Sequence, residues 1–146
     1  MRSYNARMAH TFDICIRGAG IVGRTLALLL ARERLRVALV ANPTPQAAAA
    51  PDVRAYALNT ASRTLLESLR SWPDPQHATA VARMDVFGDK DGAVHFDAAA
   101  QGAEALAWIV DVPALEQRLA EAVRDQPQVE VVQAPVNAAL TVVCEG

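Results

Sequence analysis

The sequence has little of what marks several large classes of protein. It contains 2 cysteines in 146 residues, too few for the disulfide framework of a small secreted domain. Its 14 basic and 16 acidic side chains leave a formal net charge of −2, so no basic field points to a nucleic acid as a partner. The apolar stretch at residues 26–31 is far too short to cross a bilayer. We therefore expect no nucleic-acid partner and no transmembrane segment.

Export signals are also missing from the start of the chain. Residues 1–12 include basic side chains but no apolar stretch of signal-peptide length. Together with the low cysteine count, this favours a cytoplasmic location. We predict that residues 1–11 form a disordered N-terminal segment.

The side-chain groupings of metal enzymes and hydrolases are absent from the sequence as well. His10, His77 and His95 are scattered without the spacing of metal ligands. No Ser/His/Asp or Cys/His set can be argued. Asp89 and Asp91 are interpreted as turn-forming residues rather than as a metal-binding loop. We predict no metal and no acid–base catalytic residue.

What the sequence does have is a globular composition and one informative stretch. Apolar residues make up 52% and charged residues 21% of the chain, which suits one domain with a hydrophobic core. A short apolar run at residues 14–16 enters a Gly-x-Gly-x-x-Gly turn at residues 18–23. The turn continues into an apolar helix that ends near Ala31, and a second apolar run follows at residues 36–40. This order predicts a strand–turn–helix–strand unit, the Rossmann-like βαβ fold that binds FAD or NAD(P).

Each glycine of the turn has an expected role. Gly18 permits the tight turn, Gly20 lets a pyrophosphate approach the backbone, and Gly23 allows the helix to lie close to the strand. The N–H groups of the first helical turn have no partners within the helix, and the helix dipole favours an anion there. The predicted cofactor-binding residues of the turn are Gly18, Ala19, Gly20, Ile21, Val22 and Gly23.

One expected feature of a dinucleotide site is missing. An acidic residue normally ends the second strand and holds the ribose hydroxyls. That place is taken by Ala41, followed by Asn42. Asn42 could form one hydrogen bond with a ribose, but it cannot supply the charged bidentate contact. We include both residues in the predicted site and expect weakened affinity.

The rest of the chain departs from strict strand–helix alternation. Residues 41–53 hold three prolines and an alanine run and are predicted to be a loop. A helix is expected to start at Asn59 or Thr60, with its apolar face at Ala61, Leu65, Leu66 and Leu69. Residues 83–97 read as a β-hairpin with its turn at residues 91–92, inserted as the start of an antiparallel sheet. The remaining predicted elements are a strand at 105–110, a helix at 111–123, and strands at 129–132 and 140–143.

Three blocks of sequence resemble the N-terminal part of flavin-dependent aromatic hydroxylases, especially those of ubiquinone biosynthesis. The first is the glycine turn at 18–23. The second is Asp-Val-Arg-Ala-Tyr-Ala-Leu-Asn at 52–59, with the helix that follows it. The third is Ala-Trp-Ile-Val-Asp-Val-Pro-Ala-Leu-Glu-Gln-Arg-Leu at 107–119. The similarity covers residues from about 12 to about 132, and the second block is the most specific.

The resemblance implies an FAD-binding α/β domain over residues 12–146, with NAD(P)H as co-substrate and an aromatic small molecule as the substrate. It also implies that Arg54 contacts the flavin cofactor near its ribityl-phosphate part, which suits a forked guanidinium donor. Arg118 is a further predicted cofactor contact, although an exposed helical arginine is an equal alternative. Tyr56 and Asn59 are either pocket residues or part of ordinary loop packing.

The sequence also departs from the family. Ala41 replaces the acidic ribose ligand, and Arg17 stands before the glycine turn, where the family prefers a small or apolar residue. The family's later Asp-Gly and Gly-Asp blocks and most of its substrate-binding sheet are absent. We therefore expect a fold that is incomplete relative to the family.

Two main hypotheses follow from the sequence. In the first, the chain is the FAD-binding N-terminal portion of a monooxygenase and is inactive by itself. In the second, it is a catalytically inactive truncated paralogue that acts as a binding or assembly module, with a second copy or a completing polypeptide as partner. A small NAD-binding domain is a third option.

Overall fold

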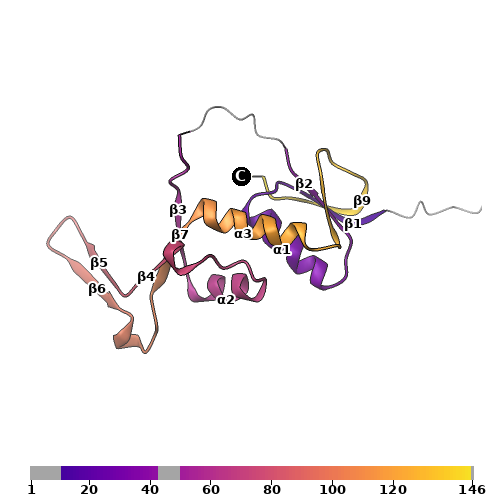
Figure 1. Cartoon of the computed structure of the whole chain (residues 1–146). Coiled ribbons are helices and arrows are strands. Elements are labelled where there is room, and N and C mark those ends of the chain that lie inside the picture. The colour runs from indigo at the N-terminus through magenta and orange to yellow at the C-terminus, as the bar shows by residue number, and fades with distance from the viewer. Residues whose placement is uncertain (1–10, 43–49, 146) are drawn as a thin grey trace, which may run out of the picture. The chain divides into compact units, whose positions relative to one another are not determined.

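A computed structural model describes residues 11–42 and 50–145. His10, nearly all of the predicted N-terminal segment 1–11 and the middle of the predicted loop 41–53 lie outside these residues. The chain divides into two compact units, one comprising Met1–Pro45 with Val123–Gly146 and the other Gln46–Ala122. Figure 1 shows the elements, and each unit is described separately below.

The first unit is built on a parallel four-stranded sheet in the order β8-β2-β1-β9. Its strands are β1 (Phe12–Arg17), β2 (Val37–Val40), β8 (Val129–Val132) and β9 (Ala138–Val143). Helix α1 (Ile21–Arg32) connects β1 to β2, so the predicted strand–turn–helix–strand unit is confirmed. All four residues of β2 are buried, as expected for an inner strand of a parallel sheet.

Apolar burial explains why these segments take these conformations. The buried residues of α1 are Gly23, Ala27, Leu28 and Ala31, which recur at helical spacing. In β1, Cys15 and Ile16 are completely buried. Phe12, Cys15, Ala38 and Val40 form one cluster, against which Val132, Val136 and Ala138 pack from β8, β9 and the segment between them. The core of this unit therefore lies against the strands of the parallel sheet.

The second unit contains an antiparallel three-stranded sheet in the order β3-β7-β4. Its strands are β3 (Ala55–Leu58), β4 (Ala78–Val81) and the central β7 (Ala107–Asp111). The sequence predicted β7 but neither of its neighbours. Both β3 and β4 are four-residue, alanine-containing strands with little apolar alternation, so their sequences give almost no strand signal.

Two further α-helices of the structure agree with the predictions from the sequence. Helix α2 (Thr60–Ser68) is capped by Asn59, whose Oδ1 accepts a hydrogen bond from the Ser62 amide at 2.9 Å. It ends slightly earlier than predicted, and Arg70 beyond it has a positive φ of 56°. Helix α3 (Val112–Arg124) buries Val112, Leu115, Leu119 and Val123. Short 3₁₀ turns, η1 (Pro75–His77) and η2 (Ala99–Gln101), lie between the strands.

An aromatic cluster in the second unit joins α2 to β7. Trp72 and Trp108 meet edge to face with ring centroids 6.2 Å apart. The Arg63 guanidinium lies 4.6 Å from the Trp108 ring centroid and 5.6 Å from that of Trp72. The same guanidinium donates hydrogen bonds to Glu67 and Glu104. The second and third blocks of the sequence resemblance therefore meet in this cluster, because Arg63 belongs to one and Trp108 to the other.

The predicted hairpin is also present, as β5 (Arg83–Phe87) paired with β6 (Ala93–Asp97). Asp91 has a φ of 54° in the connecting turn, and the Gly88 amide donates to the Gly92 carbonyl at 2.7 Å. Asp91 therefore has the turn-forming role predicted for it. Among the described residues, no helix is long and apolar enough to cross a membrane.

Candidate functional site

The glycine turn of the first unit connects a buried strand to the N-terminus of a helix. β1 ends at Arg17, Gly18 has a φ of 106°, and α1 begins at Ile21 with Gly20 as its N-cap. The first hydrogen bond of the helix runs from the Arg24 amide to the Gly20 carbonyl at 3.0 Å. Gly20 has no side chain that could cap the helix, so the amides of the first turn remain free to bind an anion.

The fold itself requires two of the three glycines. A Cβ on Gly18 would lie 2.7 Å from the carbonyl oxygen of Cys144, and its positive φ is unfavourable for any other residue. A Cβ on Gly23 would collide with the Gly18 carbonyl oxygen. These two glycines therefore allow the close packing of strand, turn and helix.

The third glycine has no such structural reason. Gly20 is exposed, has an ordinary φ of −79°, and a Cβ built on it would meet nothing within 4 Å. A Cβ at this position would therefore cause neither a clash nor an unfavourable φ. The open space above Gly20 therefore has the form expected where a ligand approaches the backbone.

The end of β2 lies beside this turn but carries no acidic side chain. The Ala41 amide donates to the Val132 carbonyl at 2.9 Å, and Asn42 is exposed. Ala41 and Asn42 thus occupy the end of β2, where a dinucleotide site normally has its acidic residue. The ribose roles of Ala41 and Asn42 remain predictions.

Sequence reasoning missed the segment that follows β9. The Cys144 amide donates to the Arg17 carbonyl at 2.7 Å, and Glu145 Oε1 lies 3.3 Å from a terminal nitrogen of Arg17. The charge of Arg17, the residue before the glycine turn, is therefore balanced by Glu145. No local signal could predict this contact, because it depends on the pairing of β1 with β9.

In the second unit, Arg54 is engaged by acidic neighbours. It donates from Nε to Asp52 Oδ1 at 2.9 Å and from Nη2 to Asp52 Oδ2 at 2.7 Å, and Glu116 lies 4.0 Å away. The hydrogen bonds from the Arg54 side chain and amide lower the pKa of Asp52 to about 2, and the carboxylate raises the pKa of Arg54. The ion pair borders a hollow of about 490 Å³ that is also lined by Val53, His77, Asp111, Pro113, Ala114 and Gln117.

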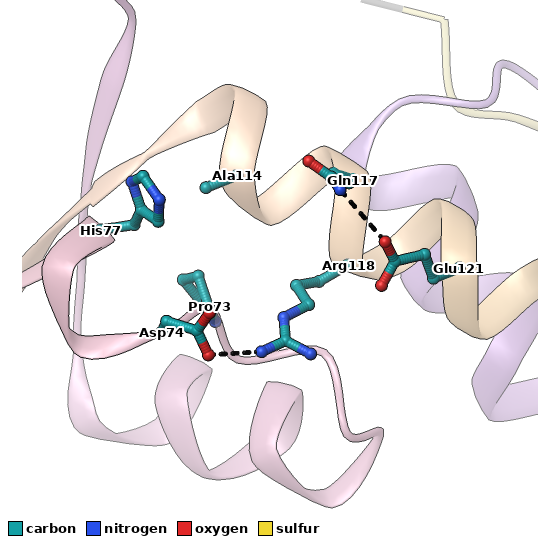
Figure 2. Close-up of a pocket in the computed structure, with 7 residues that line it drawn as sticks. All are labelled: Pro73, Asp74, His77, Ala114, Gln117, Arg118 and Glu121. Atoms are coloured by element: carbon teal, nitrogen blue, oxygen red, sulfur yellow. Dashed lines mark hydrogen bonds and ion pairs between the residues drawn. The ribbon is translucent and has the colours of Figure 1, made fainter.

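Arg118 lines a neighbouring hollow of about 360 Å³, shown in Figure 2. Its guanidinium donates to Asp74 Oδ1 at 2.5 Å, and Gln117 Nε2 donates to Glu121 Oε1 at 3.1 Å. His77, Ala114 and Gln117 line both hollows. The two predicted arginine contacts, Arg54 and Arg118, thus border adjoining hollows within one unit.

His77 is a further residue that sequence reasoning left without a role. Its Nδ1 lies 2.9 Å from Asp111 Oδ2, and its Nε2 lies 3.2 Å from Gln76 Nε2. Neither Tyr56 nor Asn59 lines the two hollows; Tyr56 is 44% exposed on β3, and Asn59 caps α2. A pocket role for Tyr56 or Asn59 therefore gains no support from these hollows.

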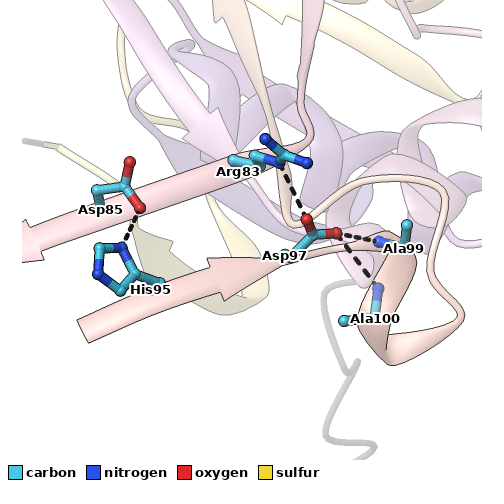
Figure 3. A network of polar contacts seen from close by, with 6 residues as sticks. All are labelled: Arg83, Asp85, His95, Asp97, Ala99 and Ala100. Atoms are coloured by element: carbon cyan, nitrogen blue, oxygen red, sulfur yellow. Dashed lines mark hydrogen bonds and ion pairs between the residues drawn. The ribbon is translucent and has the colours of Figure 1, made fainter.

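The hairpin carries its own polar contacts, which Figure 3 shows. His95 Nδ1 lies 2.6 Å from Asp85 Oδ1, and Arg83 donates to Asp97 at 3.0 Å. Asp97 also accepts hydrogen bonds from the Ala99 and Ala100 amides. In the described residues, no group of three or more His, Cys, Asp or Glu side chains could hold a metal ion.

The chain is similar to a curated protein over most of its own length. The chain is 34% identical over 122 residues to the 3-demethoxyubiquinol 3-hydroxylase of Escherichia coli (strain K12), a match that covers 80% of this chain and 31% of that protein. The chain thus spans about a third of the length of this relative. No protein-family model matches the chain.

Solved structures share the fold. The probable FAD-dependent monooxygenase pqsL of Pseudomonas aeruginosa superposes with a TM-score of 0.62 at 21% identity, covering 83% of this chain and 32% of that one. A geranylgeranyl bacteriochlorophyll reductase-like protein of Thermoplasma acidophilum gives 0.65 at 12% identity, covering 92% and 39%. The resemblance drawn from the sequence is confirmed. The chain matches only 32–39% of the length of these proteins, so the prediction of an incomplete Rossmann-like α/β fold is confirmed as well.

Proposed function

We propose that this chain is the FAD-binding N-terminal portion of a flavin-dependent monooxygenase. The whole enzyme would hydroxylate an aromatic substrate of the ubiquinone-precursor type, with NAD(P)H and dioxygen as co-substrates. The sequence similarity to a ubiquinol hydroxylase and the shared fold support this assignment. The observation that carries it is Gly20, a glycine whose backbone and surroundings would accept a side chain but whose open face suits a diphosphate.

The chain's own residues would hold the adenosine diphosphate half of the cofactor. The first-turn amides of α1 would donate to the diphosphate, and the positive end of the helix would favour its charge. Asn42 would offer one hydrogen bond to the ribose in place of the missing carboxylate. Arg54 and Arg118 are the cofactor contacts proposed in the second unit. The bound flavin would supply the redox chemistry of the whole enzyme, and the protein would orient and shield it.

We expect the isolated chain to bind FAD weakly, because Ala41 offers no charged ribose contact. Isothermal titration calorimetry with FAD, ADP, NAD and NADPH measures this directly. Gly20→Val should reduce FAD and ADP affinity at least tenfold, since the side chain would occupy the space of the diphosphate. Gly92→Val is the matched control, because Gly92 also has open space around its Cβ position but lies in the hairpin turn.

The outcomes separate the proposals. Tight FAD retention by Gly20→Val would refute a diphosphate site at this turn. Binding of NAD or NADPH in preference to FAD would favour a small NAD-binding domain. We also expect no NAD(P)H oxidation by the chain alone, and rapid NAD(P)H-dependent oxygen consumption would contradict the incomplete-enzyme part of the proposal.

A catalytically inactive binding module is the second candidate. The observation that favours it is Ala41 at the place of the ribose acid, together with apolar surface exposed on the hairpin. For this module we expect no change in FAD absorbance or fluorescence when the chain is added. A titration of FAD with the unsubstituted chain, followed by absorbance and fluorescence, therefore decides between the two candidates.

A further inference from the structure

The hollow beside Arg54 in the second unit has a charge that does not suit a phosphate group. Among the residues that the structure describes, the carboxylates of Asp52 and Asp111 and one guanidinium line it. Its formal charge is therefore −1 when His77 is counted as neutral. A further carboxylate, that of Glu116, lies 4.0 Å from Arg54 Nη2. An ionised phosphate would add about two negative charges to this surrounding, and like charges repel, so the hollow favours an uncharged ligand group.

The guanidinium fork of Arg54 is already occupied. Nε and Nη2 donate to the two carboxylate oxygens of Asp52 at 2.9 and 2.7 Å, which is the paired geometry in which arginine binds a phosphate. The other edge of the guanidinium joins Nη1 to Nη2, and Nη2 also lies near Glu116. In the described part of the chain, Nη1 has no hydrogen-bond partner. A single uncharged oxygen could therefore accept from Nη1, whereas a phosphate that took two nitrogens would approach a carboxylate.

The hollow offers acceptors as well as this donor. Asp111 Oδ2 lies 2.9 Å from His77 Nδ1, and no residue that the structure describes donates to the second oxygen of this carboxylate. Gln117 donates to Glu121 from Nε2, which leaves its Oε1 as an acceptor. A hydroxyl group can donate to such oxygens and accept from Arg54 Nη1, whereas a fully ionised phosphate can only accept. The hydrogen-bonding groups of the hollow therefore match a hydroxyl-bearing ligand.

We propose that Asp52 is a specificity-determining residue of this hollow. By holding Nε and Nη2 of Arg54, Asp52 makes the arginine a contact for an uncharged, hydroxyl-bearing group and makes the hollow reject phosphate. This inference rests on the proposed function for the identity of the ligand, whose hydroxyl-bearing part would be the ribityl chain of the flavin. Arg54 then contacts the ribityl chain rather than the phosphates, which narrows the contact that the sequence resemblance implies.

Riboflavin and FMN test this selectivity, because they share the ring system and the ribityl chain and differ by one phosphate. Fluorescence titrations use the 146-residue chain with excess ADP, which keeps the FMN phosphate from the glycine turn. The dissociation constant for riboflavin should be at least about threefold lower than that for FMN. Asp52→Asn removes the charge but keeps an acceptor for Arg54. It should raise FMN affinity at least about threefold and change riboflavin affinity less than about twofold.

A matched control and a double variant show whether Asp52 acts through Arg54. Asp97→Asn is the control, because Asp97 pairs with Arg83 at 3.0 Å on the hairpin and does not line the hollow. It should leave both dissociation constants unchanged. Adding Arg54→Gln to Asp52→Asn should abolish the gain in FMN affinity. Circular dichroism checks the fold of each variant, and a lost fold would lower both affinities instead of changing their ratio.

Titration with ADP alone separates this inference from the proposed function. Equal affinities for riboflavin and FMN, or tighter binding of FMN, would overturn the role of Asp52. An Asp52→Asn chain that keeps the ratio of the unsubstituted chain would overturn it too. A chain that binds ADP but not riboflavin would refute this inference and leave the diphosphate site at the glycine turn intact. A chain that prefers riboflavin but does not bind ADP would support the role of Asp52 and count against the glycine turn.

Discussion

The carboxylate of Asp52 accepts both arms of the Arg54 guanidinium fork, at 2.9 and 2.7 Å, from a residue only two positions away. The Arg54 amide donates to the same carboxylate at 3.1 Å. The arginine that the sequence singles out as a cofactor contact is therefore already oriented by a local ion pair. Its side chain remains 56% exposed, so a ligand in the adjoining hollow could still reach it.

The ion pair between Asp52 and Arg54 predicts that the Asp52 carboxyl group titrates at an unusually low pH. The pKa of Asp52 is lowered to about 2 from its ordinary value of 3.8, first by the Arg54 side chain and then by the Arg54 amide. Because the pKa in the folded state is depressed, the stabilisation is fully present above about pH 4 and is lost as the pH falls through about 2. Carboxyl-detected NMR should report this value in the native chain.

The Arg54→Gln variant tests whether the Arg54 side chain lowers the pKa of Asp52. It should return the Asp52 pKa toward 3.8. The pKa of Asp97, which is lowered by the Ala100 amide and by Arg83 on the hairpin, should not change. An unchanged Asp52 pKa in this variant would show that the ion pair is not formed in solution.

Substitutions at Gly18 and Gly20 should differ in their effect on the free energy of unfolding. Gly18→Ala adds a Cβ 2.7 Å from the Cys144 carbonyl at a φ of 106°, and it should lower the free energy of unfolding by about 1–3 kcal/mol. Gly20→Ala meets nothing within 4 Å and should stay within about 0.5 kcal/mol of the original chain. Urea unfolding measures both. Equal destabilisation by the two substitutions would contradict the assignment of Gly20 to ligand approach.

Trp108 and Ile109 are neighbours on β7 with opposite environments. Trp108 is 5% exposed in the aromatic cluster with Trp72 and Arg63, whereas Ile109 is 41% exposed. Trp108→Ala should cost about 3–5 kcal/mol of unfolding free energy. Ile109→Ala, the control on the outer face, should cost less than about 1 kcal/mol. Thermal and urea unfolding monitored by circular dichroism would show the difference, and similar losses would mean that the strand does not bury Trp108.

Asn59 has a structural role at the start of α2 that can be measured. Its Oδ1 accepts the Ser62 amide at 2.9 Å, so Asn59→Ala should lower the free energy of unfolding by about 1 kcal/mol. Asn59→Asp keeps an acceptor at the same position and should retain most of the stability. A loss of FAD affinity in Asn59→Asp without a loss of stability would instead support a role for Asn59 in the cofactor pocket.

The elements that the sequence predicted well are those with a strong local pattern. The glycine turn with its flanking strands, the capped helix α2, the hairpin and helix α3 all follow from side-chain periodicity and turn residues near one another in the chain. β3 and β4 were missed because four-residue strands rich in alanine have no such pattern. They are held in place by β7, to which both pair.

For the candidate site, the sequence predicted a cofactor-binding turn but not the structural reasons for its glycines. Only the structure shows that Gly18 and Gly23 are required by packing and that Gly20 is not. It also pairs Arg118 with Asp74, 44 residues away, and Arg17 with Glu145 at the far end of the chain. Such contacts depend on how distant segments meet, so no spacing rule predicts them.

The sequence by itself determined the local conformations, because periodicity, caps and turn residues act between neighbours along the chain. It also indicated the class of ligand, because a glycine turn before a helix exposes amides to an anion. The tertiary structure alone decided the strand order β8-β2-β1-β9. The reason is that strand pairing joins backbone groups far apart in sequence, and backbone groups are chemically alike at every residue except proline.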